Sequence, residues 1–435
     1  MLLRRIIIGL GGVIVVGLLG FFALAWRPAI APIQRAAKSS FRPELVARGQ
    51  VLAGAGYCVV CHTRAGGEPY AGGYPMPTPF GTIYSTNITP DPETGIGRWS
   101  LAAFARAMHE GVARDGSHLF PAFPYDHFTK VTDDDVEALY AYIMARPSVR
   151  ATPPSNTLPF PLNIRALQEG WKILFFRSGR YQPDPSKSAE WNRGAYLAEG
   201  LSHCGACHTP RNLLQAEKVS ERYAGASIEK WIAPALTDAN PSPAPWTQDE
   251  LFSYLRSGIT PLHGVSGGPM APVVHTGFAA VPDDDVRAVA VYFADLDHAA
   301  ARQAAIEPAV KKALAASLLG SGQDYDPDAQ LYAGACIGCH FNAGPAPIAA
   351  RPELALNSAL RLREPTNLIQ VLLNGIGIRE GGPGLVMPRY DWALTDGDIA
   401  RLAAYLRRTR TDQPPWSDVE KKVAAVRRRD AALNH

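Results

Sequence analysis

The pentapeptide "CVVCH" at residues 58–62 recurs in two variant forms along this chain of 435 residues. "CGACH" occupies residues 204–208 and "CIGCH" occupies residues 336–340. The chain has 6 cysteines, and all of them lie in these three motifs. Two thiols about one helical turn apart can bond to the two vinyl groups of one haem, and the histidine that follows can then ligate the iron.

Other uses of this spacing fit less well. A zinc site would need four ligands from paired motifs, and a thioredoxin-like redox pair would not occur three times in one chain. The motifs therefore predict three covalently bound haem c groups. The expected attachment residues are Cys58, Cys61, Cys204, Cys207, Cys336 and Cys339, and the expected proximal iron ligands are His62, His208 and His340.

The motifs mark an internal repeat whose interval is typical of whole domains rather than solenoid units. Before each motif lies a short amphipathic segment: "PELVARGQVLAGAGYC", "AEWNRGAYLAEGLSHC" and "PDAQLYAGAC". A middle helix is predicted in "LAAFARAMHEG", "QDELFSYLRSG" and "PTNLIQVLLNG", each closed by a glycine suited to a helix C-terminus. A last helix with an acidic first turn is predicted in "TDDDVEALYAYIMARP", "PDDDVRAVAVYFADLD" and "TDGDIARLAAYLRRTR".

Each repeat is thus predicted to be a small all-α domain around one haem, and it resembles the class I cytochrome c fold. The haem would supply apolar core that so small a domain lacks. We predict an all-α chain of three class I cytochrome c-like domains in tandem plus one N-terminal transmembrane helix. The expected parts are an anchor at 1–35, domains at 42–150, 189–300 and 320–412, a Pro-rich connector at 151–188 and a basic tail at 413–435.

Two segments outside the repeats have open roles. The connector contains "WKILFFR", which could be a strap packed on neighbouring domains or a surface for a partner or a membrane. The basic tail "VEKKVAAVRRRDAALNH" could be a solvated amphipathic helix, or it could touch anionic lipid or a partner.

Methionine positions predict the sixth iron ligands of two repeats. Met270 in "GGPMAPVVHTGF" and Met387 in "GPGLVMPRYDWAL" both lie between the middle and last helices of their repeat. A thioether or an imidazole is the usual sixth ligand of an electron-transfer haem. We therefore expect Met270 and Met387 to ligate the second and third irons.

The first repeat departs from this pattern. Its stretch "SHLFPAFPYDHF" places Phe123, which cannot bind a metal, where the other repeats have methionine. His127 is the favoured substitute and His118 is next, while His109, Met108 and an open coordination site remain alternatives. Because methionine ligation raises a haem potential and a second histidine lowers it, haem 1 is expected to have the lowest potential of the three.

The N-terminal region predicts a membrane segment. Residues 6–26 carry no charge and are long enough to span a bilayer as one helix. A cleaved signal peptide is the alternative, with Ala23-Leu24-Ala25 as its cleavage site, but the run is longer than the usual apolar core of a signal peptide. Since c-type haem is attached outside the cytoplasm, we expect an inner-membrane protein whose bulk lies on the periplasmic side.

Charge and motif content exclude several other functions. With 43 Lys+Arg against 40 Asp+Glu, the net charge is only +3, which gives no basic face for nucleic acid. The glycines of "GLGGVIVVG" lie inside the apolar run and are no nucleotide fingerprint. No Ser/His/Asp set or paired carboxylates stand out, so no residue is assigned a catalytic role and no substrate-oxidising centre is predicted in this chain.

Three further stretches carry a family resemblance: "YSTNITPDPETGIGRWS", "ARDGSHLFPAFPYDHFTKVTDDDV" and "AEWNRGAYLAEGLSHCGACHTPRN". From about residue 42 to 410 the chain resembles the triple-haem cytochrome c subunit of membrane-bound bacterial dehydrogenases. The resemblance implies a subunit that takes electrons from a catalytic dehydrogenase subunit and passes them to ubiquinone in the inner membrane.

The first-repeat stretch also resembles one subgroup of that family. "PAFPYDHF" is similar to subunits that accompany molybdenum hydroxylase-type enzymes, such as membrane-bound aldehyde dehydrogenases with an iron–sulfur subunit. Partners of the quinoprotein alcohol dehydrogenases and of the flavin-dependent gluconate and polyol dehydrogenases usually have methionine at the place of Phe123, and they are the alternative. A different class of function would be a haem peroxidase that uses an open first haem, with His118 or His127 as its acid/base group.

Overall fold

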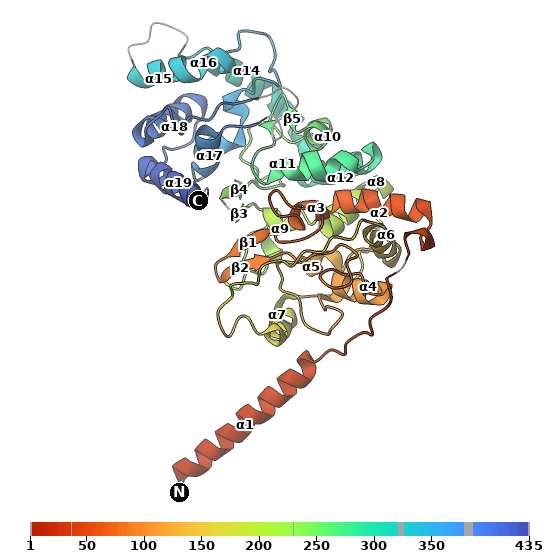
Figure 1. The fold of residues 1–435 in the computed structure, drawn as a ribbon. Helices are drawn as coiled ribbons and strands as arrows, with labels where there is room; N and C mark the ends of the chain where they lie inside the picture. The colour runs from red at the N-terminus through yellow and green to blue at the C-terminus, as the bar shows by residue number, and fades with distance from the viewer. Residues whose placement is uncertain (1, 36, 229, 321–325, 378–385, 434–435) are drawn as a thin grey trace. The chain divides into compact units, whose positions relative to one another are not determined.

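The computed structural model describes residues 2–433 except 36, 229, 321–325 and 378–385 (Figure 1). The chain divides into two compact units. Unit 1 comprises Met1–Pro183 and Glu199–His203, and unit 2 comprises Asp184–Ala198 and Cys204–His435. Both units are built mainly from helices, and the strands found in the described residues form three short antiparallel pairs.

Unit 1 contains the first CxxCH motif. Its α-helices are α1 (Leu2–Ala25), α2 (Pro43–Ala55), α3 (Cys58–Cys61), α4 (Leu101–Glu110), α5 (Tyr125–Phe128), α6 (Asp133–Met144) and α7 (Gln168–Phe175). Strands β1 (Pro75–Thr78) and β2 (Gly81–Tyr84) form a hairpin in which Pro75 pairs with Tyr84. Short 3-10 helices occupy Lys38–Ser40 and Arg165–Leu167.

The core of unit 1 forms where α2 crosses α6. A Cβ on Gly49 of α2 would collide with the backbone carbonyl of Ala138 on α6, so only glycine lets the two helices approach this closely. Tyr140, Ile143 and Met144 of α6 pack in the buried cluster beside this crossing. Helix α6 begins as predicted, with Thr132 accepting a hydrogen bond from the amide of Asp135.

Unit 2 contains the second and third motifs. Its α-helices are α8 (Ala189–Tyr196), α9 (Gly205–His208), α10 (Gln248–Ser257), α11 (Met270–Pro272), α12 (Asp283–Leu296), α13 (Ala299–Arg302), α14 (Ile306–Ser317), α15 (Pro327–Ala335), α16 (Ile337–His340), α17 (Thr366–Asn374), α18 (Asp396–Arg410) and α19 (Val419–Leu433). The paired strands are β3 (Ala226–Ile228) with β4 (Trp231–Ala233), and β5 (Ile259–Thr260) with β6 (Gly264–Val265).

Short 3-10 and π segments connect these helices. The 3-10 helices of unit 2 are Val219–Glu221, Phe278–Ala280, Gln303–Ala305, Leu354–Leu356 and Ser358–Leu360. Two π-helical segments occupy Val273–Gly277 and Leu197–Leu201, and the second of these begins in unit 2 and ends in unit 1.

The second motif lies beside a helix crossing like that of unit 1. In unit 2, α8 packs against α12, and a Cβ on Gly194 would collide with the carbonyl of Ala288. Arg193 holds the same pair of helices together through a two-pronged ion pair with Asp285, at 2.7 and 2.8 Å. The repeated close approach positions each of these two CxxCH segments at the end of a helix that is fixed against the last helix of its repeat.

The third motif lies beside the cluster formed by α15, α17, α18 and α19. Tyr332, Leu402 and Val423 are fully buried in it. The basic tail predicted from the sequence forms α19, and its valines pack into this cluster while Arg427 pairs with Asp396. The apolar face of the tail is therefore covered within the protein itself.

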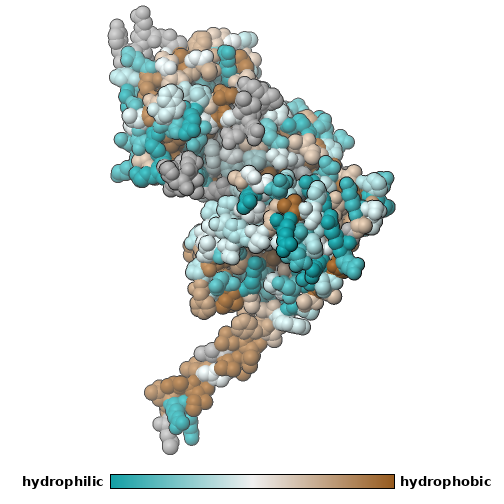
Figure 2. All heavy atoms as spheres, viewed as in Figure 1, coloured by the Kyte–Doolittle hydropathy of each residue, from teal (hydrophilic) through white to brown (hydrophobic). Residues whose placement is uncertain are grey.

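Helix α1 is mostly apolar and is exposed over most of its length, whereas Ala25 at its end is buried (Figure 2). Its most apolar window has a mean hydropathy of 2.6, and none of that window is buried. By length and composition it could cross a membrane, although an N-terminal signal sequence would meet the same criteria.

Candidate haem sites

The first CxxCH motif is a single helical turn with an oriented histidine. Tyr57, the residue before Cys58, adopts a left-handed backbone with a φ of 35°, and α3 starts directly after it. Nδ1 of His62 lies 2.7 Å from the backbone carbonyl of Thr86. A ring whose Nδ1–H donates to a carbonyl has its lone pair on Nε2, the arrangement typical of an iron-ligating histidine.

The other two motifs repeat this arrangement. Nδ1 of His208 lies 2.7 Å from the carbonyl of Pro234, and Nδ1 of His340 lies 3.3 Å from the carbonyl of Pro352. Burial lowers the pKa of His62, His208 and His340 below the ordinary value, which favours the neutral imidazole that a metal requires. The three histidines therefore share one tautomer and one charge state.

The cysteines of the motifs are thiols rather than disulfides. Burial raises the pKa of Cys58 and of Cys204 to about 12, and that of Cys336 to about 11, so these thiols are neutral. Each motif thus offers two thiols and one oriented neutral imidazole. This donor set fits a covalently attached haem c at each motif.

A small hollow lies beside the third motif. It is lined by polar groups of Tyr332, His340, Glu353 and Arg410. Nη1 of Arg410 is buried without a hydrogen-bond partner among the residues that the structure describes. An orphaned guanidinium nitrogen next to the expected proximal histidine also fits a cofactor that carries carboxylates, as haem does.

Met270 and Met387 lie in loops that precede the last helix of their repeat, as predicted. Met270 begins α11 and is half-buried. Met387 exchanges both backbone hydrogen bonds with Ile376, each at 3.0 Å, and its side chain packs against the buried cluster of α15 and α18. Their assignment as sixth ligands stays a prediction.

In the first repeat, two of the candidate histidines have both ring nitrogens engaged in unit 1. Nε2 of His118 lies 2.7 Å from the carbonyl of Ala25, and its Nδ1 lies 3.0 Å from Nζ of Lys172. Nε2 of His109 lies 3.0 Å from the carbonyl of Val131, and its Nδ1 lies 2.6 Å from a guanidinium nitrogen of Arg180. A metal at either ring would have to displace one of these contacts.

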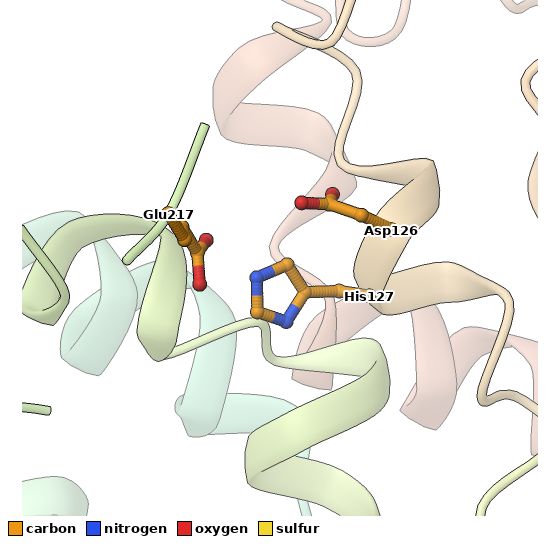
Figure 3. Close-up of side chains that lie close together, drawn as sticks. All are labelled: Asp126, His127 and Glu217. Carbon is orange, nitrogen blue, oxygen red and sulfur yellow. The ribbon is translucent and has the colours of Figure 1, made fainter. Parts of the chain in front are cut away.

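His127 has a different environment. It projects with Asp126 from the one-turn helix α5 (Figure 3) and is buried, and its Nδ1 lies 2.8 Å from the carbonyl of Glu199. This contact of Nδ1 with a backbone carbonyl is the one made by the three CxxCH histidines. Phe123 itself is half-buried and packs edge-on against Phe128, with ring centroids 5.1 Å apart.

The methionines near the first motif are packing residues in the structure. Met108 is buried on α4, and Met144 is completely buried on α6 in the core cluster. His127 shares with the three CxxCH histidines the contact of Nδ1 with a backbone carbonyl, and its role as an iron ligand stays a prediction.

Sequence reasoning missed one pair of residues. Tyr57 precedes Cys58, and His203 precedes Cys204, and both have left-handed backbones with φ of 35° and 34°. Within unit 1 the hydroxyl of Tyr57 lies 2.8 Å from Nδ1 of His203, and both side chains are buried. The sequence did contain a signal for this pair, because an aromatic ring stands directly before both the first and the second CxxCH motif.

Two family models match stretches of the chain that contain the first and third CxxCH motifs. A family model described as Cytochrome c matches residues 46–146, and one described as Cytochrome C oxidase, cbb3-type, subunit III matches residues 323–406. The chain is 47% identical over 408 residues to a nicotinate dehydrogenase subunit of Pseudomonas putida, covering 93% of this chain and 34% of that protein. It thus spans about a third of that relative's length.

Two other relatives are matched over most of their length. The gluconate 2-dehydrogenase cytochrome c subunit of Pantoea cypripedii is 36% identical, over 90% of this chain and 91% of that protein. The cytochrome c subunit of the alcohol dehydrogenase (quinone) of Gluconacetobacter polyoxogenes is 35% identical, over 88% and 84%. The chain belongs to the family of cytochrome c subunits of membrane-bound bacterial dehydrogenases.

Proposed function

We propose that this chain is a triple-haem electron-transfer subunit of a dehydrogenase complex, with its three haems in three tandem cytochrome c domains. The observation that carries the proposal is the threefold recurrence of a CxxCH turn whose histidine presents Nδ1 to a backbone carbonyl. Bound haem iron supplies reversible one-electron transfer. The residues of the chain fix the iron ligands, exclude water and set the potential.

We propose that different pairs of iron ligands give the three haems different reduction potentials. His62 with His127 would ligate the first iron, His208 with Met270 the second, and His340 with Met387 the third. Methionine ligation raises the potential relative to a second histidine, so the first haem would be the lowest.

Membership of this family supports a proposed direction of electron flow. Electrons enter from a catalytic dehydrogenase subunit, pass through the haems and leave to ubiquinone in the inner membrane. Helix α1 anchors the chain with its N-terminus in the cytoplasm, and the haem domains lie in the periplasm. Burial of Ala25 and the hydrogen bond from His118 to its carbonyl support a retained anchor, because the Ala23-Leu24-Ala25 sequence is folded rather than extended.

The proposed partner is a molybdenum-dependent dehydrogenase with an iron–sulfur subunit. The support is the "PAFPYDHF" stretch, which resembles subunits that accompany molybdenum hydroxylase-type enzymes. The identity to the nicotinate dehydrogenase subunit is 47%, against 36% and 35% for the gluconate and alcohol dehydrogenase subunits, which supports nicotinate as a candidate substrate. The proposed substrate is an aldehyde, with a heteroaromatic acid such as nicotinate as the second choice. A quinoprotein alcohol dehydrogenase or a flavin-dependent polyol or gluconate dehydrogenase is the alternative partner.

Purification of the native complex tests these assignments together. We expect three haem c groups per chain by pyridine haemochrome assay, and molybdenum with non-haem iron by elemental analysis. Acetaldehyde, nicotinate, ethanol and gluconate would then be compared as reductants of the haems. Flavin, or calcium with a quinone cofactor, in place of molybdenum would reassign the partner, and two haems per chain would contradict the haem count.

A further inference from the structure

Helix α7 has the reverse of the polarity expected for a helix on a water-facing surface. It buries Glu169 and Lys172, which are 9% and 6% exposed. It exposes Ile173 and Leu174, at 53% and 59%. A helix on a soluble protein normally buries its apolar stripe and turns its charges to water. The outer face of α7 is therefore suited to an apolar surrounding.

Buried polar contacts fix this orientation of α7. Nζ of Lys172 donates to the carbonyls of Glu110 and Gly111, at 2.6 and 2.9 Å, and lies 3.0 Å from Nδ1 of His118. Rolling the helix to cover Ile173 and Leu174 would strip a buried ammonium group of its acceptors, which is strongly unfavourable. The apolar side chains thus remain outward whatever surrounds the protein.

The same helix is attached to the end of α1. Gly170 of α7 lies against the ring of Phe21, with 3.6 Å between that ring and an ideal Cβ built on Gly170. Glu169 forms an ion pair with Arg27 at 2.9 Å, just past the end of α1 at Ala25. These contacts place α7 beside the last turn of the apolar helix.

The contact with Phe21 also indicates how deeply α7 would lie in a bilayer that α1 spans. Phe21 precedes the end of α1 by four residues, about 6 Å along the helix axis at 1.5 Å per residue. Helices that lie in a membrane interface bury their apolar face about 5–10 Å into the boundary between headgroups and acyl chains. If α1 spans the bilayer, α7 lies at the depth that interfacial helices occupy.

Residues on the segments that adjoin α7 and α1 in the sequence are also exposed and suit lipid. The loop before α7 exposes Phe160 at 79%, and Trp26 at the end of α1 is 70% exposed. Arg177, two residues after α7, is exposed and positively charged, as expected of a side chain that meets phosphate headgroups.

We propose that α7 is a membrane-interface helix that inserts Ile173 and Leu174 into the periplasmic leaflet next to α1. The inference rests on the proposed role of α1 as a retained anchor. Two lipid contacts, one spanning and one lying flat, would hold the first cytochrome domain at a fixed height over the bilayer and restrict its rotation about the anchor.

Photocross-linking of the full chain in its native membrane complex tests the proposal. The variants carry benzoylphenylalanine in place of Leu174 on α7, of Val16 on α1, or of Leu213, a 91% exposed leucine of unit 2. After irradiation, mass spectrometry identifies the adducts, and the haemochrome spectrum shows that each variant retains its haems. We expect phospholipid adducts at positions 174 and 16 and none at position 213.

The outcomes separate the two proposals. Lipid at position 16 but not at 174 overturns the interface helix and leaves the anchor intact. Lipid at 174 but not at 16 supports the interface helix and overturns the spanning anchor. Adducts of position 174 with a polypeptide show that a partner subunit covers α7, which overturns the lipid contact, and the absence of lipid at both positions overturns both proposals.

Discussion

At the scale of single residues, the second ring nitrogen distinguishes the histidines of this chain. His62, His208 and His340 each present Nδ1 to a backbone carbonyl, which fixes the tautomer that a metal needs. Both ring nitrogens of His118 instead hold the end of α1 and the ammonium group of Lys172. Histidine thus makes the contact expected of an iron ligand in one setting and acts as a structural clamp in another.

This distinction yields a prediction for the first haem. We expect His127→Ala to convert haem 1 from a low-spin to a high-spin species, because its iron loses the sixth ligand. His127→Met should keep haem 1 low-spin and raise its potential on the order of 0.1 V, since axial ligation tunes haem potentials over a wide range. Electron paramagnetic resonance and a redox titration of the purified complex measure both effects.

The matched control is His118→Gln, which keeps a donor for the carbonyl of Ala25. It should leave the spectrum and potential of haem 1 unchanged. If instead His118→Gln abolished the low-spin signal and His127→Ala preserved it, the ligand assignment would be reversed. A haem 1 that is high-spin and binds added ligands in the unaltered complex would favour the peroxidase alternative.

The sequence exposes the irregularity at Phe123 but cannot choose between the histidines around it. The choice depends on partners that are distant in the chain: the carbonyl of Ala25 is 93 residues from His118, and Lys172 is 54 residues from it. The CxxCH spacing, in contrast, is local, so attachment residues could be predicted from the sequence alone, and they stay a prediction. No local pattern reveals which ring nitrogens are already occupied.

At the scale of elements, each glycine crossing is a close approach of two helices, because an ideal Cβ on Gly49 or on Gly194 would lie 1.9 Å from a backbone oxygen of the facing helix. Gly49 and Gly194 each let the first helix of a repeat press against the backbone of the last one. We expect Gly49→Ala to lower the free energy of unfolding by about 1–3 kcal/mol, because the added methyl group meets backbone rather than a flexible side chain. Thermal unfolding followed by the haem absorption would show the loss.

Gly334 provides the control for this prediction. It lies on α15 in the third repeat, and an added Cβ would meet nothing within 4 Å. Gly334→Ala should be neutral or should stabilise the protein by up to about 1 kcal/mol through helix propensity. Equal destabilisation by both substitutions would show that the crossing is not the cause.

The buried Lys172 of α7 predicts that the free energy of unfolding depends on pH. Burial lowers the pKa of Lys172 to about 8 from an ordinary value of 10.5, while Glu169 opposes the shift and Arg27 adds to it. Above pH 8 the unfolded chain retains a proton that the folded chain has lost, so the free energy of unfolding rises with pH from 8 to 10.5. At about 1.4 kcal/mol per pH unit, the rise between about pH 7.5 and 9.5 is about 2 kcal/mol.

Comparison with Lys172→Met isolates this contribution. Urea unfolding of the detergent-solubilised protein, followed by tryptophan fluorescence, gives the free energy of each form at both pH values. The free energy of unfolding of the original protein minus that of the Lys172→Met variant should increase as pH rises. A difference that stays constant across this pH range would mean that Lys172 keeps its ordinary pKa.

Most helices could be predicted because their signals are local. The acidic first turns predicted where α6, α12 and α18 begin. Glycines predicted where α4, α10 and α17 end. These glycines are Gly111, Gly258 and Gly375, and their φ angles are 62°, 78° and 71°. The hairpins were not predicted, because strands of two to four residues contain too few positions to show alternation. The polarity of α7 was also hidden, since "WKILFF" does not reveal which face is buried.

At the scale of the whole molecule, the number of sequence repeats differs from the number of compact units. Three CxxCH motifs lie in two compact units, with the last two motifs in unit 2. Asn367 of α17 contributes to the compactness of unit 2, because its side-chain amide exchanges two hydrogen bonds of 2.8 Å with the backbone of Ile232 on β4. These residues are 135 positions apart, so the repeat pattern could not indicate their contact.

The proposed route of electrons predicts how the complex responds when one haem is missing. Paired Cys→Ala substitutions in any one motif, for example at Cys336 and Cys339, should reduce the haem content from three to two per chain. If the haems act in series, ubiquinone reduction then falls to background, because no parallel route carries the electrons. Reduction of a dye that accepts directly from the catalytic subunit should persist, since substrate oxidation occurs in that subunit.

The ratio of ubiquinone reduction to dye reduction distinguishes the possible arrangements of the haems. A selective loss of ubiquinone reduction, with an assembled complex and unchanged spectra of the remaining haems, places the missing haem on the route. A parallel loss of both activities would mean that the substitution disrupts the partner, and normal ubiquinone reduction would place that haem off the route. Applied to each motif in turn, the comparison separates three haems in series from a branched arrangement, which the sequence repeat alone cannot do.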